Sequence, residues 1–172
     1  MRRLLWVGVG IALSGCASMG SEAGLSAEAT LKDKDGKQVG YAVLIQTSDG
    51  LRIAVTGYRL PPGIHALHIH EGGKCEPPEF MTAGGHFNPT GKQHGRLNPA
   101  GPHAGDLPNM EVKSTGEGGV EITTRAVTLG SGPTSLFGIG GTSLVVHAGP
   151  DDEKTDPAGN SGDRIACGVI TK

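Results

Sequence analysis

The chain has 172 residues and a formal net charge of −2, which suits a single domain. Its 30 glycines and 11 prolines, beside only 3% aromatic residues, disfavour a helix bundle because Gly and Pro are the poorest helix formers. The 36% hydrophobic content argues against a disordered chain, and the low charge gives no electrostatic footprint for nucleic acid. Seven histidines are the unusual feature.

The first residues are typical of a secretory signal. A basic stretch over residues 1–3 precedes an apolar stretch over residues 4–13 that is too short to span a membrane. The sequence LSGC that ends at Cys16 resembles the lipobox of bacterial lipoproteins, in which this cysteine becomes the acylated first residue. Ordinary cleavage nearby is the alternative. We expect a signal peptide over 1–15, lipidated Cys16 with a small polar tether over 16–26, and one domain over 27–172.

Three expectations follow from export. By resemblance to lipoproteins, Ala17 rather than Asp after the cysteine favours anchoring at the outer membrane, in the periplasm. Loss of Arg2 and Arg3 leaves 13 basic residues against 17 acidic ones, a net charge of −4. The remaining cysteines, Cys75 and Cys167, then form a pair that indicates a disulfide. A reactive thiol pair, the alternative, would need closer spacing.

The domain is predicted to consist of short strands. Alternating apolar residues on either side of Asp49-Gly50 predict a hairpin, and nothing in the mature chain repeats at 3.6 residues. We therefore expect an all-β antiparallel sandwich or flattened barrel. About eight strands are expected, over residues 27–31, 39–46, 51–56, 64–70, 110–113, 120–124, 144–148 and 165–170.

Two long segments, 71–108 and 149–164, show no alternation. Loops of that length are uncommon in a compact domain unless they are functional or held by something else. The first contains Cys75 and three histidines, and the second lies between His147 and Cys167. A disulfide and bound metals could hold both loops.

Four histidines are predicted to meet at one metal. His68 and His70 are two residues apart on a strand, so both side chains leave the same face. His147 ends another strand, and His86 can reach the same place from the first loop. An all-imidazole site suits copper, zinc or iron, and a tetragonal nitrogen set is what Cu(II) prefers.

A second set is predicted nearby. His94, His103 and Asp106, with a fourth group shared with the first set, would form a closed nitrogen and oxygen tetrahedron of the kind that suits zinc.

Five motifs, in order, resemble those of the copper/zinc superoxide dismutases over about residues 27–172: GIHALHIHE at 63–71, GGHFNP at 84–89, HAGDLPN at 103–109, LVVH at 144–147 and GDRIACGVI at 162–170. The resemblance implies an eight-stranded Greek-key barrel with two functional loops. It also implies dismutation of superoxide to dioxygen and hydrogen peroxide by copper redox cycling, with a structural zinc and one of each metal per subunit. Such an enzyme would protect the cell envelope.

The resemblance also assigns roles to individual residues. His86, bridging both metals, and Arg164, beside the copper, would be catalytic. Asp151 would link histidines of the two metal sites, and His65 would support the copper site from beneath. The implied copper ligands are His68, His70, His86 and His147, and the implied zinc ligands are His86, His94, His103 and Asp106.

Other functions are also consistent with the sequence. One is a dismutase-like protein that binds copper and zinc without turnover, and another is a zinc hydrolase or a structural lipoprotein module. A hydrolase would need an open coordination position on zinc, which the closed set does not leave.

The expected partner is the superoxide anion, with membrane contact only through the lipid, and the sequence leaves both a monomer and a homodimer open. The 149–163 loop has five acids and one lysine, so attraction of superoxide would depend on the local field of Arg164.

Overall fold

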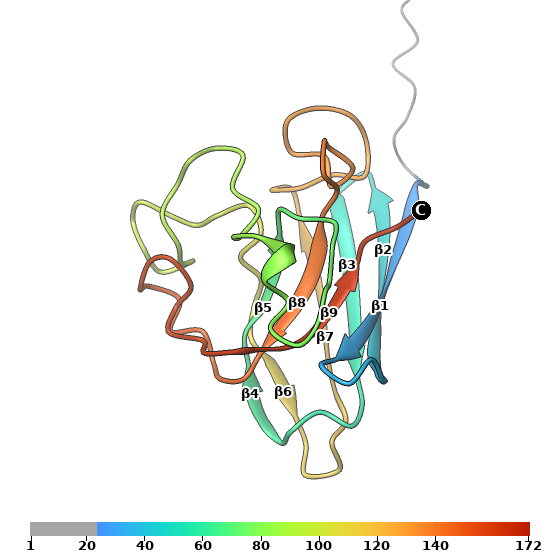
Figure 1. Ribbon diagram of the computed structural model, residues 1–172. Coiled ribbons are helices and arrows are strands. Elements are labelled where there is room, and N and C mark those ends of the chain that lie inside the picture. Colours follow the sequence, from blue (N-terminus) through green and yellow to red (C-terminus); the bar gives the residue numbers. More distant parts are fainter. Residues whose placement is uncertain (1–23) are drawn as a thin grey trace, which may run out of the picture.

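The computed structural model describes residues 24–172 (Figure 1). The expected signal peptide and Cys16 lie outside the described residues. The barrel begins slightly before the expected residue 27, because the amide of Gly24 already donates to the carbonyl of Gln46 at 2.9 Å and the first strand starts at Ser26. No helix in this part of the chain is long and apolar enough to cross a membrane.

Antiparallel strands build the whole domain, which confirms the predicted fold class. The single helical element is a short 3₁₀ turn over Met81–Ala83 within the described residues. The strands are β1 (Ser26–Asp33), β2 (Gln38–Thr47), β3 (Gly50–Gly57), β4 (Gly63–His65), β5 (Leu67–His70), β6 (Met110–Val112), β7 (Gly118–Thr124), β8 (Ser143–His147) and β9 (Arg164–Val169).

The sheet nearly closes on itself. Its strand order is β4-β6-β7-β3-β2-β1-β9-β8-β5, so the two edge strands are neighbours in the chain and are separated only by Ala66. The prediction of one strand over 64–70, and hence of eight strands, was wrong at this residue. The amide of Ala66 donates to the carbonyl of Gly149 at 2.8 Å, and its carbonyl accepts from the amide of His147 at 3.0 Å. These bonds divide the segment, so that β4 pairs with β6 and β5 with β8.

The core follows the alternation seen in the sequence. Ala27, Ala29 and Leu31 of β1 point inward, as do Leu44 on β2 and Ile53 on β3, and all are nearly inaccessible. The predicted β2–β3 hairpin is confirmed by the pairing of Thr47 with Gly50. A Cβ on Gly50 would lie 2.4 Å from the carbonyl oxygen of Thr124, so only glycine allows β3 to approach β7 so closely.

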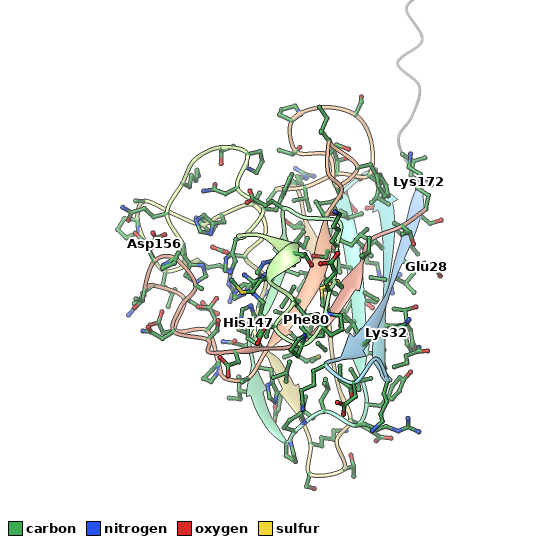
Figure 2. The ribbon with its side chains drawn as sticks, viewed as in Figure 1. Glu28, Lys32, Phe80, His147, Asp156 and Lys172 are labelled. Carbon is green, nitrogen blue, oxygen red and sulfur yellow. A yellow bond between two sulfur atoms is a disulfide. The ribbon has the colours of Figure 1, made fainter. Side chains whose placement is uncertain are left out.

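Both long loops project from one side of the barrel, to the left in Figure 1. The predicted disulfide between Cys75 and Cys167 is confirmed, with 5.6 Å between the Cα atoms, and it fastens the first loop to β9. In Figure 2, Asp156 marks the outer edge of these loops, far from the C-terminal Lys172. The loops therefore form a region of their own, and the predicted site residues gather at its base.

We expect Ile53→Ala to lower the free energy of unfolding by about 2–5 kcal/mol, because it removes buried methyl groups and leaves a cavity. Ile53 is 0% exposed. The matched control is Ile64→Ala, because Ile64 is 52% exposed and should change stability by under about 1 kcal/mol. Urea unfolding of both variants measures the difference, and equal losses would contradict this account of the core.

Candidate metal centre

Four imidazoles meet where β5 and β8 run side by side. β5 contributes His68 and His70, β8 ends at His147, and the first loop brings in His86, which forms an isolated bridge with His70. One ring nitrogen from each lies within 4.8 Å of the others, and all four residues are buried. We call them the four-histidine set. The structure thus brings together the residues that the sequence predicted as one cluster.

Each member of the four-histidine set has one buried ring nitrogen without a hydrogen-bond partner. These atoms are Nδ1 of His68 and Nε2 of His70, His86 and His147. A buried polar atom without a partner costs free energy, and four such atoms converging on one point are the arrangement that a metal ion would satisfy. Four imidazole nitrogens match the preference of copper.

In three of these rings the other nitrogen is already hydrogen-bonded, which explains the orientation of the unpartnered one. His68 Nε2 donates to the carboxylate of Asp151 at 3.0 Å. His70 Nδ1 donates to the carbonyl of Gly84, and His147 Nδ1 to the carbonyl of Gly162, each at 3.0 Å. With one nitrogen committed as a donor, each ring directs the lone pair of the other toward the shared space.

A second cluster forms around Asp106, and we call it the zinc-type set: His86, His94, His103 and Asp106. Asp106 Oδ1 lies 3.0 Å from Nδ1 of His86, 3.1 Å from that of His94 and 3.3 Å from that of His103. The Nδ1 atoms of His86 and His103 are 3.3 Å apart. Bonds of about 2.0 Å in a tetrahedron require ligand atoms about 3.3 Å apart, so the set has the dimensions of a zinc site.

Asp106 is held rigidly for this role. Its Oδ2 accepts from the amides of Gly95 and His103, both at 2.9 Å, which leaves Oδ1 to face the rings. Burial raises the pKa of this carboxyl, but hydrogen bonds from His86 and Gly95 and the charges of nearby rings outweigh it and hold the pKa well below its usual value. His68 also lies within 4.8 Å of this group, but its Nε2 is engaged by Asp151. His103 is therefore the better fourth member.

Asp151 connects the two sets. Its Oδ2 accepts from His68 Nε2, and its Oδ1 lies 2.9 Å from His94 Nε2. Burial raises its pKa, but hydrogen bonds from these two rings lower it to about 2, so it is a carboxylate at neutral pH. A carboxylate in this position orients both rings.

Burial keeps three members of the four-histidine set neutral. Desolvation lowers the pKa of His68 to about 4, of His70 to about 2 and of His147 to about 3. The positive charge of Arg164 adds to this effect at His70 and His147. Neutral imidazoles are the form that binds metals, so these three ligands are already deprotonated without metal.

Arg164 lies beside the four-histidine set at the start of β9. Its guanidinium donates to the carbonyls of Phe80 and Gly84, both at 2.7 Å, and the Gly84 carbonyl also accepts from His70. One peptide group of the first loop thus fixes both the cation and a ring of the set. Burial lowers the pKa of Arg164, but arginine remains charged in proteins.

His65 lies behind His147. Its Nδ1 is 2.7 Å from the carbonyl oxygen of His147, and its Nε2 is 2.8 Å from that of Pro61. Both nitrogens face backbone oxygens, and the side chain is 2% exposed. The structure therefore places His65 outside both sets.

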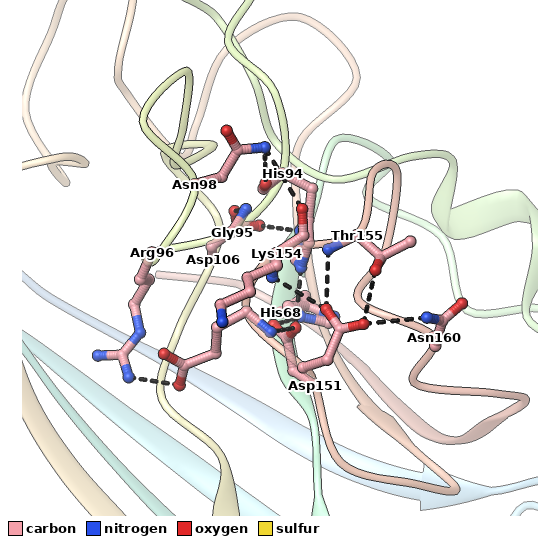
Figure 3. Close-up of polar contacts among 12 residues, drawn as sticks. His68, His94, Gly95, Arg96, Asn98, Asp106, Asp151, Lys154, Thr155 and Asn160 are labelled. Atoms are coloured by element: carbon pink, nitrogen blue, oxygen red, sulfur yellow. Dashed lines mark hydrogen bonds and ion pairs between the residues drawn. The ribbon is translucent and has the colours of Figure 1, made fainter.

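Sequence reasoning missed several groups that hold the site together. A 2.6 Å ion pair between Arg96 and Glu153 joins the 149–163 loop to the first loop. Figure 3 shows the guanidinium of Arg96 in this contact. Asp156 accepts from the amide of His94 at 2.6 Å. The side-chain amide of Asn109 donates to the carbonyl of Asp151 and accepts from its backbone amide. The charge pattern of Arg96, Glu153 and Asp156 was visible in the sequence, but nothing indicated which loops they join.

Comparisons with known proteins agree on one family. The family described as copper/zinc superoxide dismutase (SODC) matches residues 38–170. Superoxide dismutase [Cu-Zn] 2 of Aquifex aeolicus is 50% identical over 172 residues, which cover 99% of both chains.

Solved structures give the same picture. A double mutant of a SOD-like protein from Bacillus subtilis is 40% identical, with a TM-score of 0.81 over 84% of this chain and 97% of its own. Cu/Zn superoxide dismutase from Brucella abortus is 31% identical, with a TM-score of 0.69 over 84% and 99% of the two chains.

We expect the metal-free protein to lose stability as the pH falls below about 6.5, the ordinary pKa of histidine. Three ligand histidines have lower pKa values when folded, so over this range the unfolded chain binds more protons. Each can remove up to about 1.4 kcal/mol of unfolding free energy per pH unit. Urea unfolding of metal-free protein at about pH 7.5 and about pH 5 measures the loss. Equal stability at both would contradict the neutral, buried state of these rings.

Proposed function

The chain belongs to the copper/zinc superoxide dismutase family, and we propose from this premise that the four-histidine set binds its copper and the zinc-type set its zinc. As a member of the family it converts superoxide to dioxygen and hydrogen peroxide. The observation that carries the assignment is the convergence of four buried, unpartnered ring nitrogens in one set. The tetrahedral spacing around Asp106 Oδ1 supports zinc at the other set.

The two metals supply different chemistry. Copper, when bound, supplies the one-electron redox chemistry, whereas zinc has none and fixes the geometry of its ligands. The chain's own contribution begins with His86, the only residue in both sets: its Nδ1 faces Asp106, and its Nε2 faces the other three histidines. We propose that His86 Nε2 is where the chain holds a proton between the two halves of the reaction. While the proton is held, the 3.0 Å contact between His86 Nδ1 and Asp106 keeps the ring in place.

Arg164 is proposed to bind and orient superoxide. The substrate is an anion, and the guanidinium is a fixed cation whose two bonds to backbone carbonyls direct it beside the four-histidine set. The loop over residues 149–163 contains Asp152, Glu153, Asp156 and Asp163 besides the buried Asp151. Attraction therefore depends on the local field of Arg164 rather than on the net charge of the protein.

Asp151 and His65 are proposed as positioning residues. Asp151 would hold one ring of each metal site in the tautomer that each metal needs, as carboxylates behind ligand histidines commonly do. His65 would fix the end of β8, because its Nδ1 lies 2.7 Å from the carbonyl of His147.

We also propose that the enzyme is exported and anchored through lipidated Cys16 to the outer membrane, where it protects the cell envelope from superoxide. The support is the order of a basic stretch, a short apolar stretch and the LSGC sequence, together with a disulfide, a bond typical of oxidising compartments. The mass of the N-terminal peptide from membrane-purified protein tests this: acyl chains on Cys16 are expected, and an unmodified cysteine would contradict it.

We expect the two metals to be lost separately. His147→Ala should remove copper and keep zinc, because His147 belongs only to the four-histidine set. His103→Ala should remove zinc preferentially, and His86→Ala should weaken both. Metal content by mass spectrometry, measured with dismutation on reconstituted protein, checks the three variants, each serving as a control for the others. Retention of copper by His147→Ala, or a fully loaded native protein without dismutation, would overturn the proposal.

We expect Arg164→Ala to lower kcat/KM for superoxide about 10-fold or more, within the range of electrostatic steering, with copper still bound. Arg52→Ala is the matched control because it removes the same charge from an exposed pair with Glu121 on the barrel's outer face. It should leave the rate close to native. If Arg164→Ala showed the native rate and salt dependence, the role of Arg164 would be wrong.

A further inference from the structure

The two rings that belong only to the zinc-type set, those of His94 and His103, face carboxylates of the second loop on their outer side. The Nδ1 atoms of both rings face the shared carboxylate oxygen of the set, so each Nε2 points away from it. His94 Nε2 lies 2.9 Å from Asp151 Oδ1, and His103 Nε2 lies 3.8 Å from Asp156 Oδ1. Asp156 is thus placed behind His103 as Asp151 is behind His94.

One oxygen of Asp156 reaches both of these histidines. Besides its approach to His103, Asp156 Oδ1 accepts a hydrogen bond from the backbone amide of His94 at 2.6 Å. Bonds from backbone amides to a carboxylate are among the stronger ones in proteins, so this one fixes the oxygen near the His103 ring. The Asp156 side chain is half exposed, whereas the His103 ring is nearly buried. The carboxylate therefore covers the zinc-type set from the solvent side.

Other contacts hold this part of the second loop against the first. The carboxylate of Asp152 accepts from the amide of Thr155 at 2.8 Å and from its hydroxyl at 2.7 Å. The side-chain amide of Asn98 donates to the carbonyls of His94 and Lys154, at 3.0 and 3.3 Å (Figure 3). The two backbones are thus joined by groups other than the carboxylate that follows Thr155, which leaves that carboxylate a role at the rings.

The 3.8 Å approach can become a hydrogen bond when His103 binds zinc. A neutral imidazole has one proton, and coordination through Nδ1 leaves that proton on Nε2. His103 Nε2 is then an N–H donor that faces a carboxylate. A shift of about 0.9 Å brings 3.8 Å to the usual 2.9 Å. A carboxylate that accepts from a ligand histidine fixes the orientation of the ring and raises the basicity of the ligand nitrogen.

We propose that Asp156 is a positioning residue for zinc, whose carboxylate orients the ring of His103 through Nε2 while it holds the backbone of His94. The inference rests on the proposed zinc site. Partners of this kind commonly raise metal affinity about 10- to 100-fold. Because Asp156 is half exposed, its contribution should lie at the lower end of that range, since water screens an exposed charge.

The test measures the zinc affinity of the full chain loaded with copper, by competition with a chelator. We expect Asp156→Ala to weaken zinc binding about 10-fold. Asp156→Asn should weaken it about 3-fold, because its amide oxygen still accepts hydrogen bonds but carries no charge. Glu153→Gln is the matched control, since it removes the same charge from the same loop and breaks the ion pair with Arg96 that joins the loops. It should stay within about 2-fold of native.

A direct readout is the Nε2–H signal of His103 in the proton–nitrogen NMR spectrum of protein loaded with zinc and reduced copper. A ring proton that is hydrogen-bonded to a carboxylate exchanges slowly with water. The signal should therefore be present in native protein and in Glu153→Gln, and absent from Asp156→Ala. Its persistence in Asp156→Ala would show that another group holds the ring.

The outcomes separate this inference from the proposed function. Native zinc affinity in Asp156→Ala, or an equal loss in Glu153→Gln, overturns the inference alone, because the carboxylate would then only join the loops. If urea unfolding shows that Asp156→Ala does not fold, Asp156→Asn decides: weaker zinc binding supports the inference, and native affinity overturns it. A native chain that binds no zinc overturns the proposed zinc site and the inference together.

Discussion

The metal centre depends on one constraint: a buried imidazole that is to bind a metal must have one ring nitrogen engaged and the other bare. Three rings of the four-histidine set meet it through Asp151 and the carbonyls of Gly84 and Gly162, and His86 through Asp106. Burial then keeps the rings of His68, His70 and His147 neutral without metal. These acceptors preorganise the site. Many of the surrounding contacts serve to keep the acceptors in position.

Most of these acceptors come from loops, which have little apolar surface to order them. The disulfide fastens the first loop to β9, and the guanidinium of Arg164 binds the same loop at Phe80 and Gly84. The second loop is held by Asp151 and by the contacts of Asp156 and Glu153 with the first. The carbonyl of Gly84 contacts both Arg164 and His70. One network of contacts therefore orders the loop, positions a metal ligand and orients the cation that binds the substrate.

The sequence alone determined the strand pattern, the cysteine pair and the grouping of the histidines, because each depends on residue type at a fixed spacing. Alternation identifies a strand with one buried face, and His68 and His70 share a face because the period of a strand is two. Only the tertiary structure decided the division of the fourth strand at Ala66, the acceptors at Gly84 and Gly162, and the contact of Asp156 with His94. Every residue has a backbone carbonyl, so no residue type marks the one that a histidine will use. Loops have no periodicity from which a partner can be inferred, and these bonds are fixed only when distant segments meet.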